Sequence, residues 1–308
     1  MRWPRLRDPT RPAPPPEALG ADMFEVDCEF YRQTYRDARR LTDEQVRRHY
    51  AATGKPQGRM PAPHAVREHF GSLLADRRKI LEIGPFLAPI CKGERVKYFD
   101  ILDKAGLEKR GREIRFPGSE APHIDFVEAS GDLSCVDEKF DAVVSSHCVE
   151  HQPDLLEHFA QVERLLAPGG RYFLLIPDHR YCFDHFLRAS TALDVVRAHN
   201  EKRRRHTLQA KIQHVALTTH NDAARHWAGD HADPLYPYSI RDRVAQAIRE
   251  YEEAAGDYID MHAWQFTPQS LASLLHELAI GDRVALRPVC IYPTPRGRSE
   301  FVAVLGRA

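Results

Sequence analysis

The chain has 308 residues, enough for one large domain with appendages or for two small domains. Its 44 basic and 44 acidic residues balance, so no overall field favours a nucleic acid or a membrane surface as the partner. No run approaches the ~20 apolar residues of a membrane span, the start lacks an apolar signal-peptide segment, and six cysteines without C-x-x-C spacing favour a reducing cytoplasm.

The first sixty residues divide into a tail and a compact unit. Residues 1–20 are rich in proline and arginine, and we expect them to be disordered. Residues 21–60 predict a helical motif, with aromatic residues at helical spacing, a helix start at Thr42 and a stop at Gly54. This motif resembles one found beside glycosyltransferases and other enzymes of bacterial surface-glycan assembly, although a generic helical hairpin shares the spacing. The matching residues are Asp27, Phe30, Tyr31, Tyr35, His49, Tyr50, Gly54, Gly58 and Arg59.

Strands and helices are expected to alternate through the rest of the chain. Strands are predicted at 79–83, 96–99, 124–128, 140–146 and 171–176, and helices at 64–75, 101–110 and 154–166. This alternation predicts an α/β fold with a doubly wound, mostly parallel, Rossmann-like sheet. A helix from Thr267 to Leu278 and strands at 283–292 and 300–305 predict a C-terminal antiparallel hairpin. We therefore expect one domain over 61–308, with a large insert at 178–264 after the fifth strand.

The turn after the first predicted strand is the expected centre of a ligand site. Gly84 has no Cβ, so the backbone can turn sharply there and approach a ligand closely. Asp100 ends the second strand sixteen residues later, near the ~20-residue spacing at which an acid meets a ribose. Because Pro85 and the residues after it lack the G-x-G-x-x-G pattern, a pyrophosphate has no usual cradle, which favours a nucleoside ligand without phosphates.

Taken in order, the motifs of the sheet region resemble those of class I S-adenosylmethionine-dependent methyltransferases. The resemblance covers about 79–177 and 265–305, and it includes a Gly-Pro variant of the first motif at Gly84-Pro85. The matching stretches are 81–84 (LEIG), Asp100, 132–133 (DL), 140–144 (FDAVV), 150–151 (EH) and 165–170 (LLAPGG).

The resemblance implies a methyltransferase with S-adenosyl-L-methionine as its cofactor. It places the methionine end over the Gly84 turn, the ribose hydroxyls on Asp100, and the adenine amino group on Asp132. The alternative for each acid is a helix N-cap or a surface loop. The residues implied to contact the cofactor are Glu82, Gly84, Pro85, Asp100, Asp132, Leu133, Ser146 and His147.

The insert is where we expect the acceptor to bind. Eight of the 17 histidines lie between His185 and His262, and tryptophans stand beside polar residues there, which suits a sugar. Methylation of a hydroxyl needs a base, and histidine is the commonest one near neutral pH. Any single histidine has a surface or structural role as its alternative. The candidate bases are His226, His231 and His262 in the insert and His151 at the sheet edge.

The sequence therefore predicts O-methylation of a sugar or glycan hydroxyl, with glycan-assembly enzymes as further partners and no nucleic acid. A divalent metal is an alternative use of the insert, but the spacing fits no recognised zinc pattern, so no metal ligands are assigned. A second reading is a metal- and histidine-dependent transferase or hydrolase that no longer uses the cofactor. A third is a non-catalytic scaffold that docks through the N-terminal helices. The residues that offer metal ligands are His220, Asp222, His226, Asp230, His231 and His262.

Overall fold

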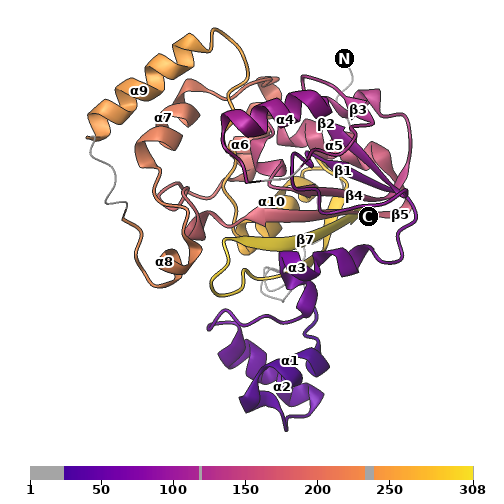
Figure 1. Cartoon of the computed structure of the whole chain (residues 1–308). Coiled ribbons are helices and arrows are strands. Elements are labelled where there is room, and N and C mark those ends of the chain that lie inside the picture. The colour runs from indigo at the N-terminus through magenta and orange to yellow at the C-terminus, as the bar shows by residue number, and fades with distance from the viewer. Residues whose placement is uncertain (1–23, 118–119, 233–238, 308) are drawn as a thin grey trace, which may run out of the picture.

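A computed structural model describes residues 24–117, 120–232 and 239–307, so the tail expected at 1–20 lies outside the described residues. These residues build a seven-stranded sheet in the order β3-β2-β1-β4-β5-β7-β6. The first five strands pair in parallel, and β7 pairs antiparallel with both β5 and β6 (Figure 1). The predicted α/β class, with an antiparallel C-terminal pair on a mostly parallel sheet, is confirmed. The strands are β1 (Ile80–Ile83), β2 (Val96–Asp100), β3 (Phe126–Val127), β4 (Phe140–Ser146), β5 (Leu166–Pro177), β6 (Leu286–Ile291) and β7 (Glu300–Arg307).

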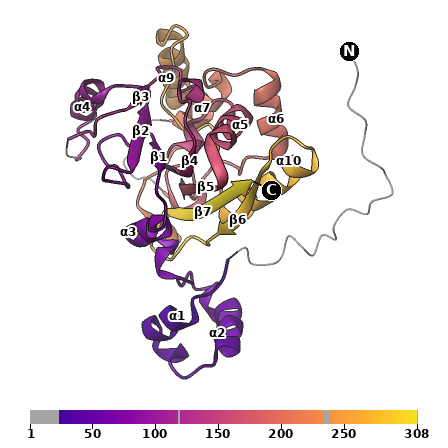
Figure 2. The ribbon, with the colours of Figure 1, turned by 90° about the vertical axis from the view of Figure 1, so that its right-hand side faces the viewer.

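Both faces of the sheet are covered, because alternate residues of each strand point to opposite sides. In β4, Val143 belongs to the core on one face, whereas Ala142 and Val144 belong to the core on the other. Helices α5, α6 and α10 cover the first face, and α3 and α4 cover the second (Figure 2). The helices are α1 (Cys28–Thr34), α2 (Asp43–His49), α3 (Arg67–Phe70), α4 (Lys104–Glu113), α5 (Leu155–Leu165), α6 (Ala192–Asn200), α7 (Leu208–Leu217), α8 (Ala223–Trp227), α9 (Ile240–Glu253) and α10 (Pro268–Ile280).

The N-terminal helices form a small unit below the sheet in both views (Figures 1 and 2). Its own core is built around Tyr31 and Tyr50, which are almost fully buried. Arg59 makes a bidentate ion pair with Asp37, with both N···O distances at 2.8 Å. The unit is tied to the sheet domain where the backbone N–H of Arg296 donates to the carbonyl of Gly58 at 2.7 Å.

The segment between β5 and α10 places α7, α8 and α9 beside the sheet, at the left of Figure 1. Helices α7 and α9 pack against each other, with Lys211 Nζ 2.5 Å from Glu250 Oε2. Among the described residues, every helix is too short or too polar to cross a membrane.

Several predicted boundaries differ from the structure; the helix predicted at 101–110 is Lys104–Glu113 and the strand predicted at 283–292 is Leu286–Ile291. The helix expected at 64–75 is broken into short turns around α3, and the third strand is two residues long instead of five. The fifth strand begins at Leu166, which pairs with Phe140, so the glycines at 169 and 170 lie within an irregular strand and not in a turn. For the two strands, the boundary is set by pairing with a neighbouring strand, which the local sequence does not encode.

Candidate functional site

The site lies where the strand order reverses, between β1 and β4. Their carboxyl ends lie side by side because Ile83 pairs with Ser145, and ligands of open α/β sheets bind in the crevice at such a point. Gly84 follows β1 with φ +68°, a conformation that favours glycine. A Cβ built on Gly84 would lie 3.5 Å from Cys148 Sγ, so the turn after β1 lies directly against the loop after β4.

Glu82 supports this turn from beneath. Its side chain is 2% exposed, and its two carboxylate oxygens accept hydrogen bonds from the backbone N–H groups of Ile90 and Cys91 at 2.8 and 2.9 Å. Burial raises the pKa of Glu82 to about 7, against the lowering effect of those hydrogen bonds. Glu82 and the buried Pro85 therefore shape the loop, and the Glu82 oxygens face the chain's own backbone.

Asp100 ends β2 beside the same turn. It is 7% exposed, and its Oδ1 accepts a hydrogen bond from the Ile101 N–H at 2.7 Å. Burial raises the pKa of Asp100 to about 6. The Gly84 N–H donates to the Phe99 carbonyl at 2.9 Å, which holds the turn and the end of β2 together.

The acidic turn after β3 has a structural role in the chain. Asp132 Oδ1 accepts from the Ser134 N–H at 2.8 Å and from Gln161 Nε2 at 2.9 Å, so Asp132 is an N-cap. Leu133 is fully buried in the core and has no exposed surface that an adenine ring could cover in this structure.

Ser146 and His147, at the end of β4, are held by an ion pair from elsewhere in the chain. Arg67 Nη2 donates to Ser146 Oγ at 2.8 Å and lies 2.6 Å from Glu300 Oε2. The same Glu300 oxygen lies 2.7 Å from His147 Nε2. Burial works to raise the pKa of Glu300, but hydrogen bonds from His147 and Arg67 outweigh it and lower this pKa to about 2. His147 has φ +50°, so its backbone is strained at this edge.

Glu150 lies at the centre of a histidine cluster just after β4, in the 3-10 turn η7 (Val149–His151). Its side chain is fully buried, and within the described part of the chain neither carboxylate oxygen has a hydrogen-bond partner. Oε1 lies 3.6 Å from His147 Nδ1, 3.8 Å from His151 Nε2 and 3.8 Å from His262 Nε2. We call Glu150 and these three histidines the Glu150 cluster.

Each histidine of the Glu150 cluster has a carboxylate at its outer nitrogen. His262 Nδ1 lies 2.7 Å from Asp184 Oδ2, and both residues are buried. His151 Nδ1 lies 3.0 Å from Asp260 Oδ1, although the two atoms are not aligned for a hydrogen bond. Burial works to lower the pKa of His151, but Asp260 and Glu150 outweigh it and raise this pKa.

The other two predicted bases, His226 and His231, belong to a second histidine cluster on α8. His226 is 3% exposed, and its Nε2 donates to the His220 carbonyl at 3.0 Å. Its Nδ1 lies 3.0 Å from His231 Nδ1, and the His231 ring stacks on His185 with centroids 3.7 Å apart. The four candidate bases thus divide between two clusters, and only His151 and His262 belong to the Glu150 cluster.

Two tryptophans of the insert region, Trp227 and Trp264, pack against other parts of this chain and so offer little surface to a sugar. Trp264 is 3% exposed in the core. Trp227 stacks on Tyr181 with ring centroids 4.1 Å apart and an interplanar angle of 9°. An aromatic ring that remains accessible is Phe186, which is 56% exposed.

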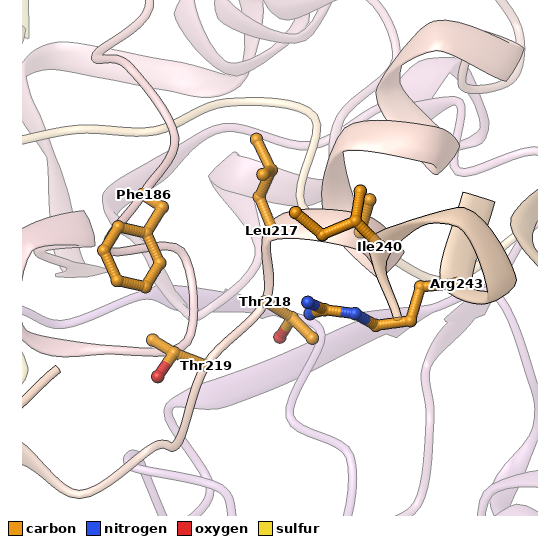
Figure 3. Close-up of a pocket in the computed structure, with 7 residues that line it drawn as sticks. Phe186, Leu217, Thr218, Thr219, Ile240 and Arg243 are labelled. Carbon is orange, nitrogen blue, oxygen red and sulfur yellow. The ribbon is translucent and has the colours of Figure 1, made fainter. Parts of the chain in front are cut away.

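Phe186 lines a cavity of about 200 Å³ in the insert, between the end of α7 and the start of α9 (Figure 3). Thr218 and Thr219 bring hydroxyl groups to it, and the guanidinium of Arg243 lies beside Thr218. The remaining lining residues are Ala216, Leu217 and Ile240.

Sequence reasoning did not identify Glu150, Asp184, Asp260 or Glu300 as site residues. Glu150 and Asp184 stand next to histidines in the motifs EH and DH, but nothing local shows that residues 78 positions apart, such as Asp184 and His262, meet. A signal was present in the acids that follow predicted strands, because the ends of parallel strands lie at the same edge.

Comparison with known proteins links part of this region to a family. Residues 88–174 match the family described as "Methyltransferase domain", which confirms the prediction of a methyltransferase domain over this range. No curated protein sequence matched the chain.

Several solved structures share part of the fold. The glycopeptide N-methyltransferase MtfA complexed with sinefungin is 21% identical, over 36% of this chain and 53% of its own, with a TM-score of 0.28. A DhpI–SAH complex is 17% identical, over 51% of this chain and 70% of its own, with a TM-score of 0.27. The CcbJ methyltransferase from Streptomyces caelestis is 17% identical, over 40% of this chain and 55% of its own, with a TM-score of 0.28. The chain thus spans about half the length of the MtfA structure that it matches.

Proposed function

We propose that this chain is an S-adenosylmethionine-dependent methyltransferase that methylates a hydroxyl group of a sugar or glycan. The observation that carries the proposal is the buried carboxylate of Asp100 beside the Gly84 turn, at the switch point of a sheet whose central part matches a methyltransferase domain. The choice of a sugar or glycan as the acceptor rests on other observations, namely the cavity at Phe186 and the N-terminal motif.

The residues around the switch point suit a nucleoside with a methionine tail. Gly84 keeps the turn free of a side chain, and Glu82 fixes the loop that follows. Asp100 accepts hydrogen bonds from the backbone N–H groups of Ile101, Phe86 and Leu102, and a carboxylate has about four lone-pair sites, so it can accept a further bond from a ribose hydroxyl. When bound, the cofactor supplies a methyl group attached to a sulfonium sulfur. As this methyl group passes to the acceptor oxygen, the sulfur keeps the electron pair of the broken C–S bond.

The Glu150 cluster suits removal of the acceptor's proton as the new C–O bond forms. Asp184 holds the Nδ1–H tautomer of His262, so the lone pair of Nε2 faces the interior of the cluster. His151 Nδ1 also lies near a carboxylate, 3.0 Å from Asp260 Oδ1, although these two atoms are not aligned for a hydrogen bond. A proton accepted there would be stabilised by the adjacent carboxylates, which is the usual support of an imidazole base.

The cavity at Phe186 supports a sugar acceptor. An accessible aromatic ring, two threonine hydroxyls and a guanidinium line it, so both the apolar face and the hydroxyls of a sugar find partners. Its volume of about 200 Å³ is below the ~300–1,000 Å³ of ordinary ligand pockets, which suits a single sugar unit. The resemblance of residues 21–60 to a motif of glycan-assembly enzymes points to the same class and makes such enzymes the proposed partners, in the cytoplasm.

The experiment is calorimetric titration of the purified chain with S-adenosylmethionine and S-adenosylhomocysteine. We expect stoichiometric binding by the wild type, and at least a tenfold loss in Asp100→Ala. Asp137→Ala, which removes an exposed carboxylate before the amino end of β4, at the opposite end of that strand from Gly84 and Asp100, is the matched control and keeps wild-type affinity. Absence of binding by folded wild-type protein would overturn the proposal. It would favour the alternative of a metal- and histidine-dependent transferase or hydrolase that does not use this cofactor.

The acceptor class is tested separately with radiolabelled methyl donor and a panel of sugars, nucleotide sugars and glycans. Phe186→Ala is expected to raise KM for the sugar while cofactor affinity stays unchanged. Transfer to peptide or catechol acceptors but to no sugar would contradict the acceptor class and leave the methyltransferase assignment intact.

A further inference from the structure

We propose that Glu150, His151 and His262 form a binding site for one divalent transition-metal ion, of the kind that imidazole ligands favour, such as Zn²⁺. One ligand atom from each of these residues lies within 4.8 Å of the other two. Two imidazoles and one carboxylate are a common ligand set for such ions, with further positions left open for water or substrate.

The first argument is the environment of Glu150. A fully buried carboxylate without a hydrogen bond is costly, and chains normally pair such a group with a cation or with donors. Both oxygens of Glu150 lack a hydrogen-bond partner among the described residues. A cation between Glu150 and the histidines would satisfy these oxygens.

The second argument is the spacing around Glu150 Oε1. Its distances of 3.8 Å to the Nε2 atoms of both His151 and His262 exceed the 2.7–3.2 Å of a hydrogen bond. Ligand atoms at ~2.0–2.2 Å from a tetrahedral Zn²⁺ are separated by about 3.3 Å. The two distances from Glu150 Oε1 therefore exceed the ligand spacing of a bound ion by about half an ångström.

The third argument is the outer partner of each histidine. Metal-ligating histidines usually donate their other ring N–H to a carboxylate or carbonyl, which fixes the tautomer and orients the ligand atom. His262 has Asp184 in this place at 2.7 Å, and His151 has Asp260 at 3.0 Å. His147 repeats the pattern, with Glu300 at 2.7 Å outside and Glu150 at 3.6 Å inside, so it is placed to supply a fourth ligand.

The backbone also holds the ligands in register. The Glu150 carbonyl accepts hydrogen bonds from the N–H groups of Ala263 and Trp264 at 2.7 and 3.1 Å. These bonds tie η7 to the segment that carries His262, although the two are more than a hundred residues apart. Such preorganisation is what a metal site needs from its supporting shell.

The second histidine cluster is the natural comparison. His226 Nδ1 and His231 Nδ1 are 3.0 Å apart, and His226 carries its proton on Nε2, where it donates to a carbonyl. The pair is therefore satisfied by an N–H···N hydrogen bond, and it contains no carboxylate that lacks a partner. This difference makes His231 a matched control for the test.

The role of the ion rests on the proposed function. A bound divalent cation lowers the pKa of a hydroxyl that it contacts. With an ion bound, Glu150, His151 and His262 would act as its ligands, and the proton of the ionised hydroxyl would pass to solvent and not to the two histidines, which is the alternative to the histidine base of the proposed function. Metal binding itself is measured without cofactor or acceptor, so it stands or fails separately from the methyltransferase assignment.

The experiment is titration of chelator-treated full-length protein with Co²⁺, followed by visible absorbance and by competition with Zn²⁺. We expect one Co²⁺ per chain that Zn²⁺ displaces, with affinity at least tenfold lower in both Glu150→Gln and His262→Ala. Asp184→Asn, which alters only the outer partner of His262, is expected to lower affinity by about 10- to 100-fold. His231→Ala keeps wild-type affinity.

Circular dichroism and thermal unfolding show whether each variant is folded. Asp184→Asn keeps the test decisive if a ligand variant does not fold. Absence of stoichiometric binding by the wild type would overturn the proposal. So would loss of binding in His231→Ala with retention in Glu150→Gln.

Discussion

His262 Nδ1 lies 2.7 Å from Asp184 Oδ2, and this buried pair joins two segments that are 78 residues apart in the chain. Asp184 follows β5, whereas His262 precedes α10. The pair therefore links the first part of the insert, after β5, to its last part, before α10. The link lies beside the Glu150 cluster, to which His262 belongs.

A double-mutant cycle is expected to show that this pair is energetically coupled. Asp184→Ala leaves a buried imidazole N–H without its partner, and His262→Ala leaves a buried carboxylate without its own, so each single change should destabilise the fold. The double variant should cost less than the sum of the two, by about 0.5–3 kcal/mol. Urea unfolding of the four proteins at neutral pH measures the coupling, and strict additivity would contradict it.

Cofactor affinity should depend on the charge of Asp100. Burial raises its pKa to about 6 in the free protein, and only the ionised carboxylate accepts hydrogen bonds with both oxygens. Affinity for S-adenosylhomocysteine is therefore expected to fall as the pH is lowered through about 6. Calorimetry across this range provides the measurement. Asp100→Asn should bind at least tenfold more weakly and lose this part of the pH dependence; the same decline in the variant would assign the titration to another group.

Stability at acid pH should report on His158, which is 3% exposed and lies 3.0 Å from the Tyr172 hydroxyl. Burial lowers its pKa from 6.5 to about 4, so the folded state binds this proton less tightly than the unfolded chain. Stability is therefore lost as the pH falls from about 6.5 towards 4, by about 3 kcal/mol in total.

His158→Phe removes this titration and keeps an aromatic ring in the core. Between about pH 7.5 and 4.5, the free energy of unfolding of the wild type should fall further than that of the variant by about 2 kcal/mol. Urea denaturation at each pH gives both values. Parallel curves would show that His158 does not contribute.

Two glycines, Gly54 in the N-terminal unit and Gly71 beside α3 of the sheet domain, offer a matched pair of substitutions. A Cβ on Gly54 would contact the Tyr31 hydroxyl and lie 2.8 Å from the Tyr50 ring, so Gly54→Ala should destabilise the unit by about 1–3 kcal/mol through overpacking. Gly71 has an ordinary helical φ of −56° and open space around its Cβ position. Gly71→Ala should be neutral or stabilise by up to about 1 kcal/mol.

Thermal unfolding followed by tyrosine fluorescence compares the two variants with the wild type. Equal effects of the two substitutions would refute the packing argument for Gly54.

The parts of the fold that depend on local signals were predictable. The apolar run FDAVVSS coincides with β4 at Phe140–Ser146, and the Thr267 cap with Pro268 marks the start of α10. Strand β3 is shorter than predicted because only Phe126 and Val127 find partners in β2. Strand ends are set by such pairing, which lies between distant segments.

The candidate site was predictable only in its strand-end residues. Gly84 and Asp100 come together because parallel strands end at the same edge, a rule that can be applied to a sequence. The division of the histidines could not be predicted, since His226 pairs within α8 and its loop while His262 reaches back to Glu150. The composition predicted one histidine-rich region. In the folded chain its histidines are divided between the Glu150 cluster, which contains a buried carboxylate, and the cluster of His226 and His231.

The Glu150 cluster draws its members and their partners from four separate stretches of chain: the loop after β4, the loop after β5, the segment before α10 and the first residue of β7. The stretch that matches a methyltransferase domain, 88–174, supplies only the first of these. Synthesis must therefore pass Glu300 before the cluster can close. A product that stops before this residue would lack part of the cluster even where the five parallel strands had already paired.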